Sequence, residues 1–68
     1  MPRTYYTLCV WDAEQATWFD EFGDYSRAAV AEELEGHFAP KRHKQIIKTD
    51  GSMADLIAKR DGLAAPKG

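Results

Sequence analysis

The chain has 68 residues, of which 44% are hydrophobic and 29% are charged, and its formal net charge is −2. This length predicts a single small domain, and the composition excludes the low hydrophobicity that is typical of disordered proteins. No apolar run approaches the roughly 18 residues of a membrane span, and no basic start leads into an apolar stretch, so we expect neither a membrane helix nor a signal peptide.

Cysteine and histidine, the usual protein ligands of structural zinc sites, are scarce in this chain. Cys9 is the only cysteine, which excludes an intramolecular disulfide and favours a cytoplasmic protein. His37 and His43 bring the potential soft ligands to three, and their spacing does not match that of structural zinc sites. The sequence therefore predicts no metal and no cofactor. A core this small contributes little net stability, so we expect self-association or a partner chain to add to it.

Two strands, joined as a β-hairpin, are predicted at the start of the chain. Residues 4–11 and 17–22 are rich in β-branched and aromatic side chains, which suit a pleated surface. Alternation leaves neither face of the first strand purely polar, so we expect that strand to be central. In the second strand, alternation places Trp18 and Phe22 on one face and Phe19 on the other.

A helix is predicted after the hairpin, over residues 27–37. Ser26 precedes it and can accept a hydrogen bond from one of its first free amides. Val30, Leu34 and Phe38 recur at four-residue spacing. This periodicity predicts an apolar stripe that faces the sheet.

A third strand and a short second helix complete the predicted elements. Residues 45–49 form the strand, and an Asp-Gly turn ends it. Ser52 then begins a segment that resembles a capping box, and Gly62 is the predicted stop of the helix. We therefore predict one domain over residues 1–63 and a disordered C-terminal tail over residues 64–68.

The predicted fold class is α+β, with the element order β-β-α-β-α. Handedness rules return the third strand beside the first, which gives a three-stranded antiparallel sheet in the order 2-1-3 with the main helix on one face. The other face is either open, with aromatic side chains such as Tyr5, Trp11 and Trp18 toward solvent, or covered by the second helix and the loops. An open aromatic face is typical of a protein interface.

Charge is distributed unevenly along the chain. Residues 12–35 contain eight acids and one base, whereas the chain from residue 41 onward contains seven bases and three acids. The acids indicate either a patch for a basic partner or a solvated helix face. The basic segment 41–48 indicates either contact with nucleic-acid phosphates or a complement to the dipole of the preceding helix.

The sequence contains no recognisable catalytic set. Nucleophilic catalysis by Cys9 requires a base such as His43 within reach, but a cysteine in the middle of a strand is more typical of an inert, buried side chain. Asp20 and Glu21 are neighbours in a strand, so their carboxylates are expected on opposite faces. Glycine-rich phosphate loops are absent from the sequence. We therefore predict that the protein is not an enzyme.

Several short motifs give the chain a resemblance to known proteins. They are YYTL at residues 5–8, Trp18, FGDY at 22–25, Val30 with Glu32 and Glu33, and IIKT at 46–49. Together, over roughly two-thirds of the chain, they resemble small proteins carried by phages, plasmids and integrated elements. The resemblance implies a mobile-element origin but no activity, ligand or site residue. The hairpin-then-helix order is also similar to antitoxin domains of the HicB type, although the chain lacks their glycine-rich loop.

Two functions are consistent with these features. The first is a non-enzymatic protein-interaction module, for which a homodimer is one form. Its candidate residues are Tyr5, Trp11, Trp18, Glu32, Glu33 and Glu35. The alternative is a weak nucleic-acid-binding protein that uses the basic segment together with a stacking tyrosine or tryptophan. Its candidate residues are Lys41, Arg42, Lys44 and Lys48.

Overall fold

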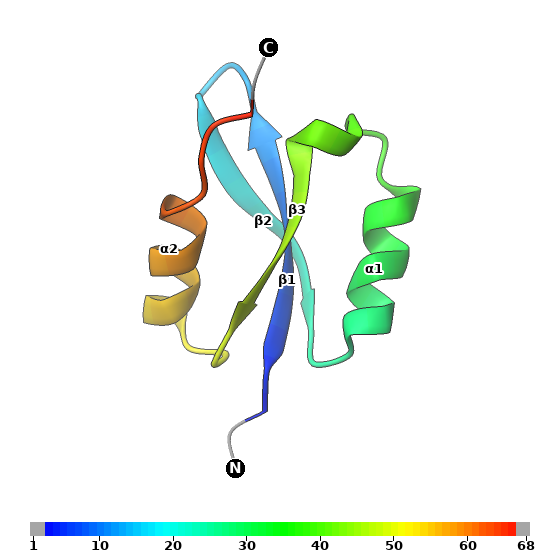
Figure 1. Ribbon diagram of the computed structural model, residues 1–68, viewed down its shortest axis with the longest axis vertical. Coiled ribbons are helices and arrows are strands. Elements are labelled where there is room, and N and C mark those ends of the chain that lie inside the picture. Colours follow the sequence, from blue (N-terminus) through cyan, green and yellow to red (C-terminus); the bar gives the residue numbers. More distant parts are fainter. Residues whose placement is uncertain (1–2, 67–68) are drawn as a thin grey trace.

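The computed structural model describes residues 3–66 as a three-stranded sheet between two helices (Figure 1). The elements in chain order are β1 (Tyr5–Asp12), β2 (Thr17–Asp24), α1 (Arg27–Gly36), a 3-10 turn η1 (Lys41–His43), β3 (Lys44–Thr49) and α2 (Met53–Asp61). The strands are antiparallel and lie in the order β2-β1-β3. The predicted fold class and strand order are therefore confirmed.

A β-bulge interrupts the pairing of the hairpin. Leu8 and Cys9 are neighbours in β1, but their partners in β2 are Phe22 and Asp20, which leaves Glu21 as an extra residue. An extra residue in one strand reverses which side chains share a face beyond it. By contrast, β1 and β3 pair without a shift along the whole of β3.

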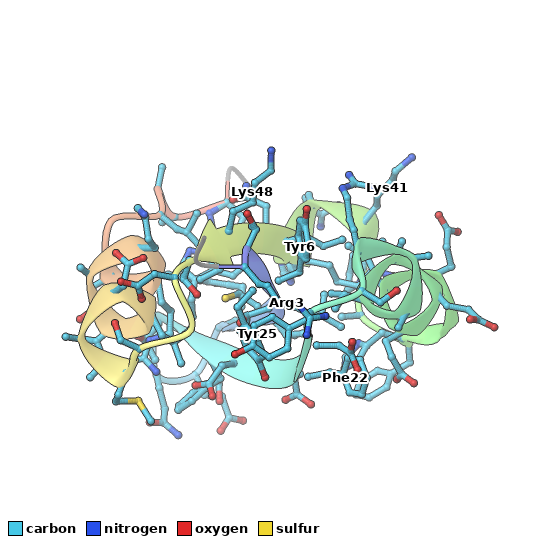
Figure 2. All side chains as sticks on the ribbon, turned by 90° about the horizontal axis from the view of Figure 1, so that it is seen from below. Arg3, Tyr6, Phe22, Tyr25, Lys41 and Lys48 are labelled. Carbon is cyan, nitrogen blue, oxygen red and sulfur yellow. The ribbon has the colours of Figure 1, made fainter. Side chains whose placement is uncertain are left out.

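The two faces of the sheet carry separate apolar clusters. On the face toward α1, Leu8 and Val30 are fully buried. The cluster on the other face consists of Cys9, Trp18 and Ile47, with Trp11, Leu56 and Leu63 packed against it. The prediction that Trp18 and Phe22 share a face is wrong, because the bulge lies between them. Phe22 is paired with Leu8 and lies on the α1 side (Figure 2).

Helix α2 covers the face of the sheet for which the sequence left two arrangements open. Arg60 of α2 forms an ion pair with Asp20 of β2 at 3.0 Å. The indole Nε1 of Trp18 donates a hydrogen bond to the backbone oxygen of Ala64, at 3.2 Å, and Trp18 is only 4% exposed. Of the two arrangements, the structure therefore has the covered one, and Trp18 is not directed toward solvent. Of the predicted tail, residues 67–68 lie outside the described residues, whereas Ala64 contacts the sheet.

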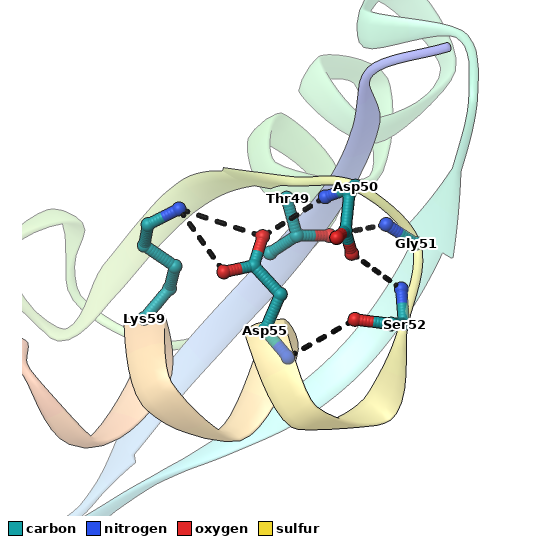
Figure 3. A network of polar contacts seen from close by, with 6 residues as sticks. All are labelled: Thr49, Asp50, Gly51, Ser52, Asp55 and Lys59. Carbon is teal, nitrogen blue, oxygen red and sulfur yellow. Dashed lines mark hydrogen bonds and ion pairs between the residues drawn. The ribbon is translucent and has the colours of Figure 1, made fainter. Parts of the chain in front are cut away.

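A polar network fixes the turn between β3 and α2 (Figure 3). Ser52 caps α2 as predicted, because its hydroxyl accepts a hydrogen bond from the amide of Asp55 at 3.2 Å. The Asp55 carboxylate in turn accepts a hydrogen bond from the amide of Asp50 at 3.0 Å and forms an ion pair with Lys59 at 3.3 Å. Hydrogen bonds from Ser52 lower the pKa of the Asp50 carboxyl. The network anchors the start of the helix that covers Trp18.

Candidate interaction surface

The most exposed large apolar side chain of the described residues belongs to Phe38, which is 96% exposed. The sequence predicted that Phe38 would join Val30 and Leu34 on the buried stripe of α1. That prediction is wrong, because α1 ends at Gly36 and His37 adopts an extended conformation with φ −76° and ψ 138°. The four-residue spacing no longer describes a helix face after this point, and Phe38 is directed into solvent.

Polar contacts hold the backbone on either side of Phe38 in place. The imidazole Nδ1 of His37 accepts a hydrogen bond from the amide of Ala39 at 3.0 Å, and its ring stacks on Phe38 with centroids 4.6 Å apart. The opposite nitrogen, Nε2, lies 3.9 Å from a carboxylate oxygen of Glu21. The exposed ring is therefore presented by a loop with defined contacts.

Lys44 fixes the same loop to the sheet. Its ammonium group donates hydrogen bonds to the backbone oxygens of Leu34, at 2.7 Å, and His37, at 3.0 Å. Both oxygens lie at the C-terminal end of α1, where carbonyls lack partners within the helix and a cation is favourable. Of the two interpretations of the basic segment, complementing the helix end is the one that the structure supports for Lys44.

A groove of about 480 Å³ lies on one side of Phe38, between the hairpin loop and the loop that follows α1. Its apolar walls include Val10, Trp11, Phe19, Phe38 and Pro40. Its polar groups are Asp12, Glu14, Glu21, His37 and His43. Phe19 is itself 38% exposed, so the groove offers a second aromatic ring to an incoming side chain.

A second hollow, of about 420 Å³, lies on the other side of Phe38. It is lined by Glu32, Glu33, Gly36, His37 and Phe38. Both hollows thus have carboxylates at the rim and share the same aromatic ring. We call Phe38 together with the residues that line these two hollows the Phe38 surface.

The structure separates the six residues that the sequence proposed for protein interaction. Trp11 lines the groove, but its ring also packs edge-on against Trp18, at 5.5 Å, in the cluster under α2. Glu32 and Glu33 line the second hollow. Glu35 is exposed on α1 but lines neither hollow.

Besides Glu35, two more of the six proposed residues do not belong to this surface. Trp18 is buried beneath α2. Tyr5 is half-buried at the other end of β1, where its ring packs edge-on against Tyr25 at 4.9 Å. Sequence reasoning missed Phe38 itself. The signal that could have found it is Gly36, which allows the helix to end before the apolar spacing does.

The residues proposed for nucleic-acid contact lie along one edge of the sheet. Lys41 and Arg42 are exposed in η1, and Lys48 is exposed near the end of β3 (Figure 2). Lys44 differs from them because it is half-buried and bonded to the end of α1. The structure therefore brings three of the four predicted cations to an accessible edge.

Cys9 is fully buried, and its thiol is poorly suited to nucleophilic chemistry. Burial, followed by the charge of the nearby Asp20 carboxylate, raises the pKa of the Cys9 thiol from 9.0 to about 11. Within residues 3–66, no cluster of three or more His, Cys, Asp or Glu side chains could hold a metal ion. In the same part of the chain, no helix has the length and apolarity that crossing a membrane requires.

Comparison with models of known protein families, with curated proteins and with solved structures finds no match to this chain.

Proposed function

We propose that this chain is a non-enzymatic cytoplasmic protein-interaction module that binds its partner through the Phe38 surface. The observation that carries the proposal is the 96% exposure of an aromatic ring on a loop held by hydrogen bonds. Aromatic side chains dominate the binding energy of protein interfaces, and exposing one to water without a partner is unfavourable.

The charge around the ring indicates the chemistry of the partner. Five carboxylates line the two hollows: Asp12, Glu14, Glu21, Glu32 and Glu33. A partner that fits this surface has an apolar pocket for Phe38 and basic side chains around that pocket, because complementary charge speeds association and fixes orientation. The resemblance to phage and plasmid proteins agrees with a small protein that acts by binding.

The proposal is tested by comparing capture of partners by the wild-type chain and by two variants. Phe38→Ala removes the exposed ring, and we expect roughly 30-fold weaker binding, as is typical when an interface aromatic is truncated. Met53→Ala is the matched control, because Met53 is an exposed apolar side chain on α2, 67% accessible and outside the Phe38 surface. We expect Met53→Ala to bind like the wild type.

The solution mass of the purified wild-type chain is measured first by light scattering, because the proposed partner includes a second copy of the chain. If the chain is a dimer, the same two variants are compared by the concentration at which the dimer dissociates. A partner that binds Phe38→Ala as tightly as the wild type, when circular dichroism shows that both are folded, contradicts the proposal.

A further inference from the structure

The two open edges of the sheet carry opposite charges. Helices α1 and α2 lie on its two faces, so β2 and β3 form free edges on opposite sides (Figure 2). Strand β2 contributes Asp20, Glu21 and Asp24 and no base. The β3 edge, together with η1, contributes Lys41, Arg42, Lys44 and Lys48 and no acid.

The β3 edge is also the more regular of the two. It pairs with β1 without any register shift, from Tyr5 opposite Thr49 to Val10 opposite Lys44. Alternate backbone N–H and C=O groups of such an edge strand point outward and can pair with another strand. The β2 edge is less suitable, because the bulge at Glu21 bends the strand and breaks the ladder.

The cations of the β3 edge are available to a ligand. Among the side chains of residues 3–66, no carboxylate forms an ion pair with Lys41, Arg42 or Lys48. Lys44 is the exception in this group, because its ammonium group is bonded to the end of α1. The free edge therefore combines an unpaired backbone ladder with unpaired positive charge.

We propose that β3 binds an extended, acidic peptide segment of another protein, which adds to the sheet as a fourth strand. Backbone hydrogen bonds hold such a peptide, and side chains at alternate positions give the specificity. A second copy of β3 is a poor occupant, since the pairing would bring together two edges that are both basic. The proposal concerns a surface separate from the Phe38 surface and does not depend on it.

The pairing with β1 shows where acidic side chains of the peptide belong. Lys44, Ile46 and Lys48 are paired with Val10, Leu8 and Tyr6, so they share the face toward α1. A peptide with carboxylates at every second position aligns them with this face. Its intervening β-branched residues lie on the face toward α2.

The test is a nuclear magnetic resonance titration of the full chain with a capped heptapeptide of alternating glutamate and valine, with glutamate at both ends. We expect the largest shifts at the amides of residues 44–49, together with slower hydrogen exchange there. Lys48→Glu is expected to weaken binding roughly tenfold, because it places like charges together. Arg27→Glu is the matched control, since it makes the same charge change at an exposed position on α1.

Three results overturn the proposal. The first is the absence of shifts at residues 44–49 up to millimolar peptide. The second is equal binding by a peptide in which lysine replaces every glutamate. The third is tighter binding of single-stranded or duplex oligonucleotides than of the peptide at the same amides and salt, which assigns this edge to nucleic acid.

The same titration of Phe38→Ala separates this proposal from the proposed function. Peptide binding that is unchanged in Phe38→Ala and lost in Lys48→Glu supports the assignment to β3. Binding that is lost in Phe38→Ala and kept in Lys48→Glu places the peptide on the Phe38 surface and overturns it.

Discussion

Gly23 lies where an aromatic ring occupies the space that a side chain would need. A Cβ atom at this position would lie 2.7 Å from Cε2 and 2.8 Å from Cζ of Tyr5. The Tyr5 ring cannot simply turn away, because it packs edge-on against Tyr25. Arg3 lies over the Tyr25 ring, with its guanidinium carbon 4.4 Å from the centre of that ring (Figure 2).

We therefore expect Gly23→Ala to lower the free energy of unfolding by about 1–3 kcal/mol, the usual cost of overpacking. In a Tyr5→Ala background the same substitution should cost clearly less, because the obstructing ring is gone. Urea denaturation of the two single variants and the double variant measures this coupling. Gly36→Ala is the control, since nothing lies within 4 Å of its position, and a loss as large as that of Gly23→Ala would contradict the explanation.

At the scale of single residues, the sequence predicted capping better than exposure. Ser26 and Ser52 were predicted as helix caps, and both hydroxyls accept the expected amide hydrogen bonds. Capping is local, because the donor lies three residues away from the acceptor. The exposure of Phe38 and the burial of Trp18 depend on where α1 ends and where α2 packs, which short-range spacing does not determine.

At the scale of elements, the sequence predicts that α2 exists but does not determine which face of the sheet it covers. The sequence predicts only a short helix that begins after Ser52, and in the structure Leu56 of this helix packs against the buried cluster. Two other apolar side chains of α2, Met53 and Ile57, are exposed. The position of α2 over Trp18 comes from tertiary contacts, including the ion pair between Arg60 and Asp20.

We expect Ser52→Ala to lower the free energy of unfolding by about 1 kcal/mol, because an amide at the start of α2 loses its side-chain acceptor. Thermal unfolding followed by tryptophan fluorescence measures the loss, and Trp18 reports on the covering helix directly. Ser52→Asp should retain most of the stability, since a carboxylate also caps a helix. Equal stability of Ser52→Ala and the wild type would show that the network in Figure 3 does not depend on this cap.

The bulge in β2 explains why strand positions were predicted more accurately than strand faces. The predicted strand over residues 17–22 lies within β2, which spans Thr17–Asp24. The alternation of side chains between the two faces predicts the wrong face beyond Glu21, because Glu21 is an extra residue without a partner in β1. A hairpin sequence read alone contains no record of this shift.

At the scale of the whole molecule, folding is linked to the ionisation of a single buried group. The Cys9 thiol has its pKa raised by burial to about 11 in the folded chain, against 9.0 for an accessible thiol. A raised pKa stabilises the fold fully below pH 9.0, and this contribution is lost as the pH rises toward about 11. The unfolded chain releases its thiol proton over that interval, whereas the folded chain retains it.

We therefore expect the free energy of unfolding to fall by up to ~1.4 kcal/mol per pH unit above pH 9.0, in excess of the fall shown by Cys9→Ala. Urea denaturation at several pH values measures both slopes. In the same pH range the folded protein should react slowly with a thiol reagent, and the unfolded protein rapidly. Parallel slopes for the two proteins would contradict the linkage.

The hydrogen bonds of Lys44 have a consequence for how the molecule responds to its surroundings. One ammonium group connects the outer strand to the carbonyls from which the loop of Phe38 departs. The exposed ring and the free edge therefore share a mechanical support. Loss of the Lys44 side chain would therefore loosen both locations at once.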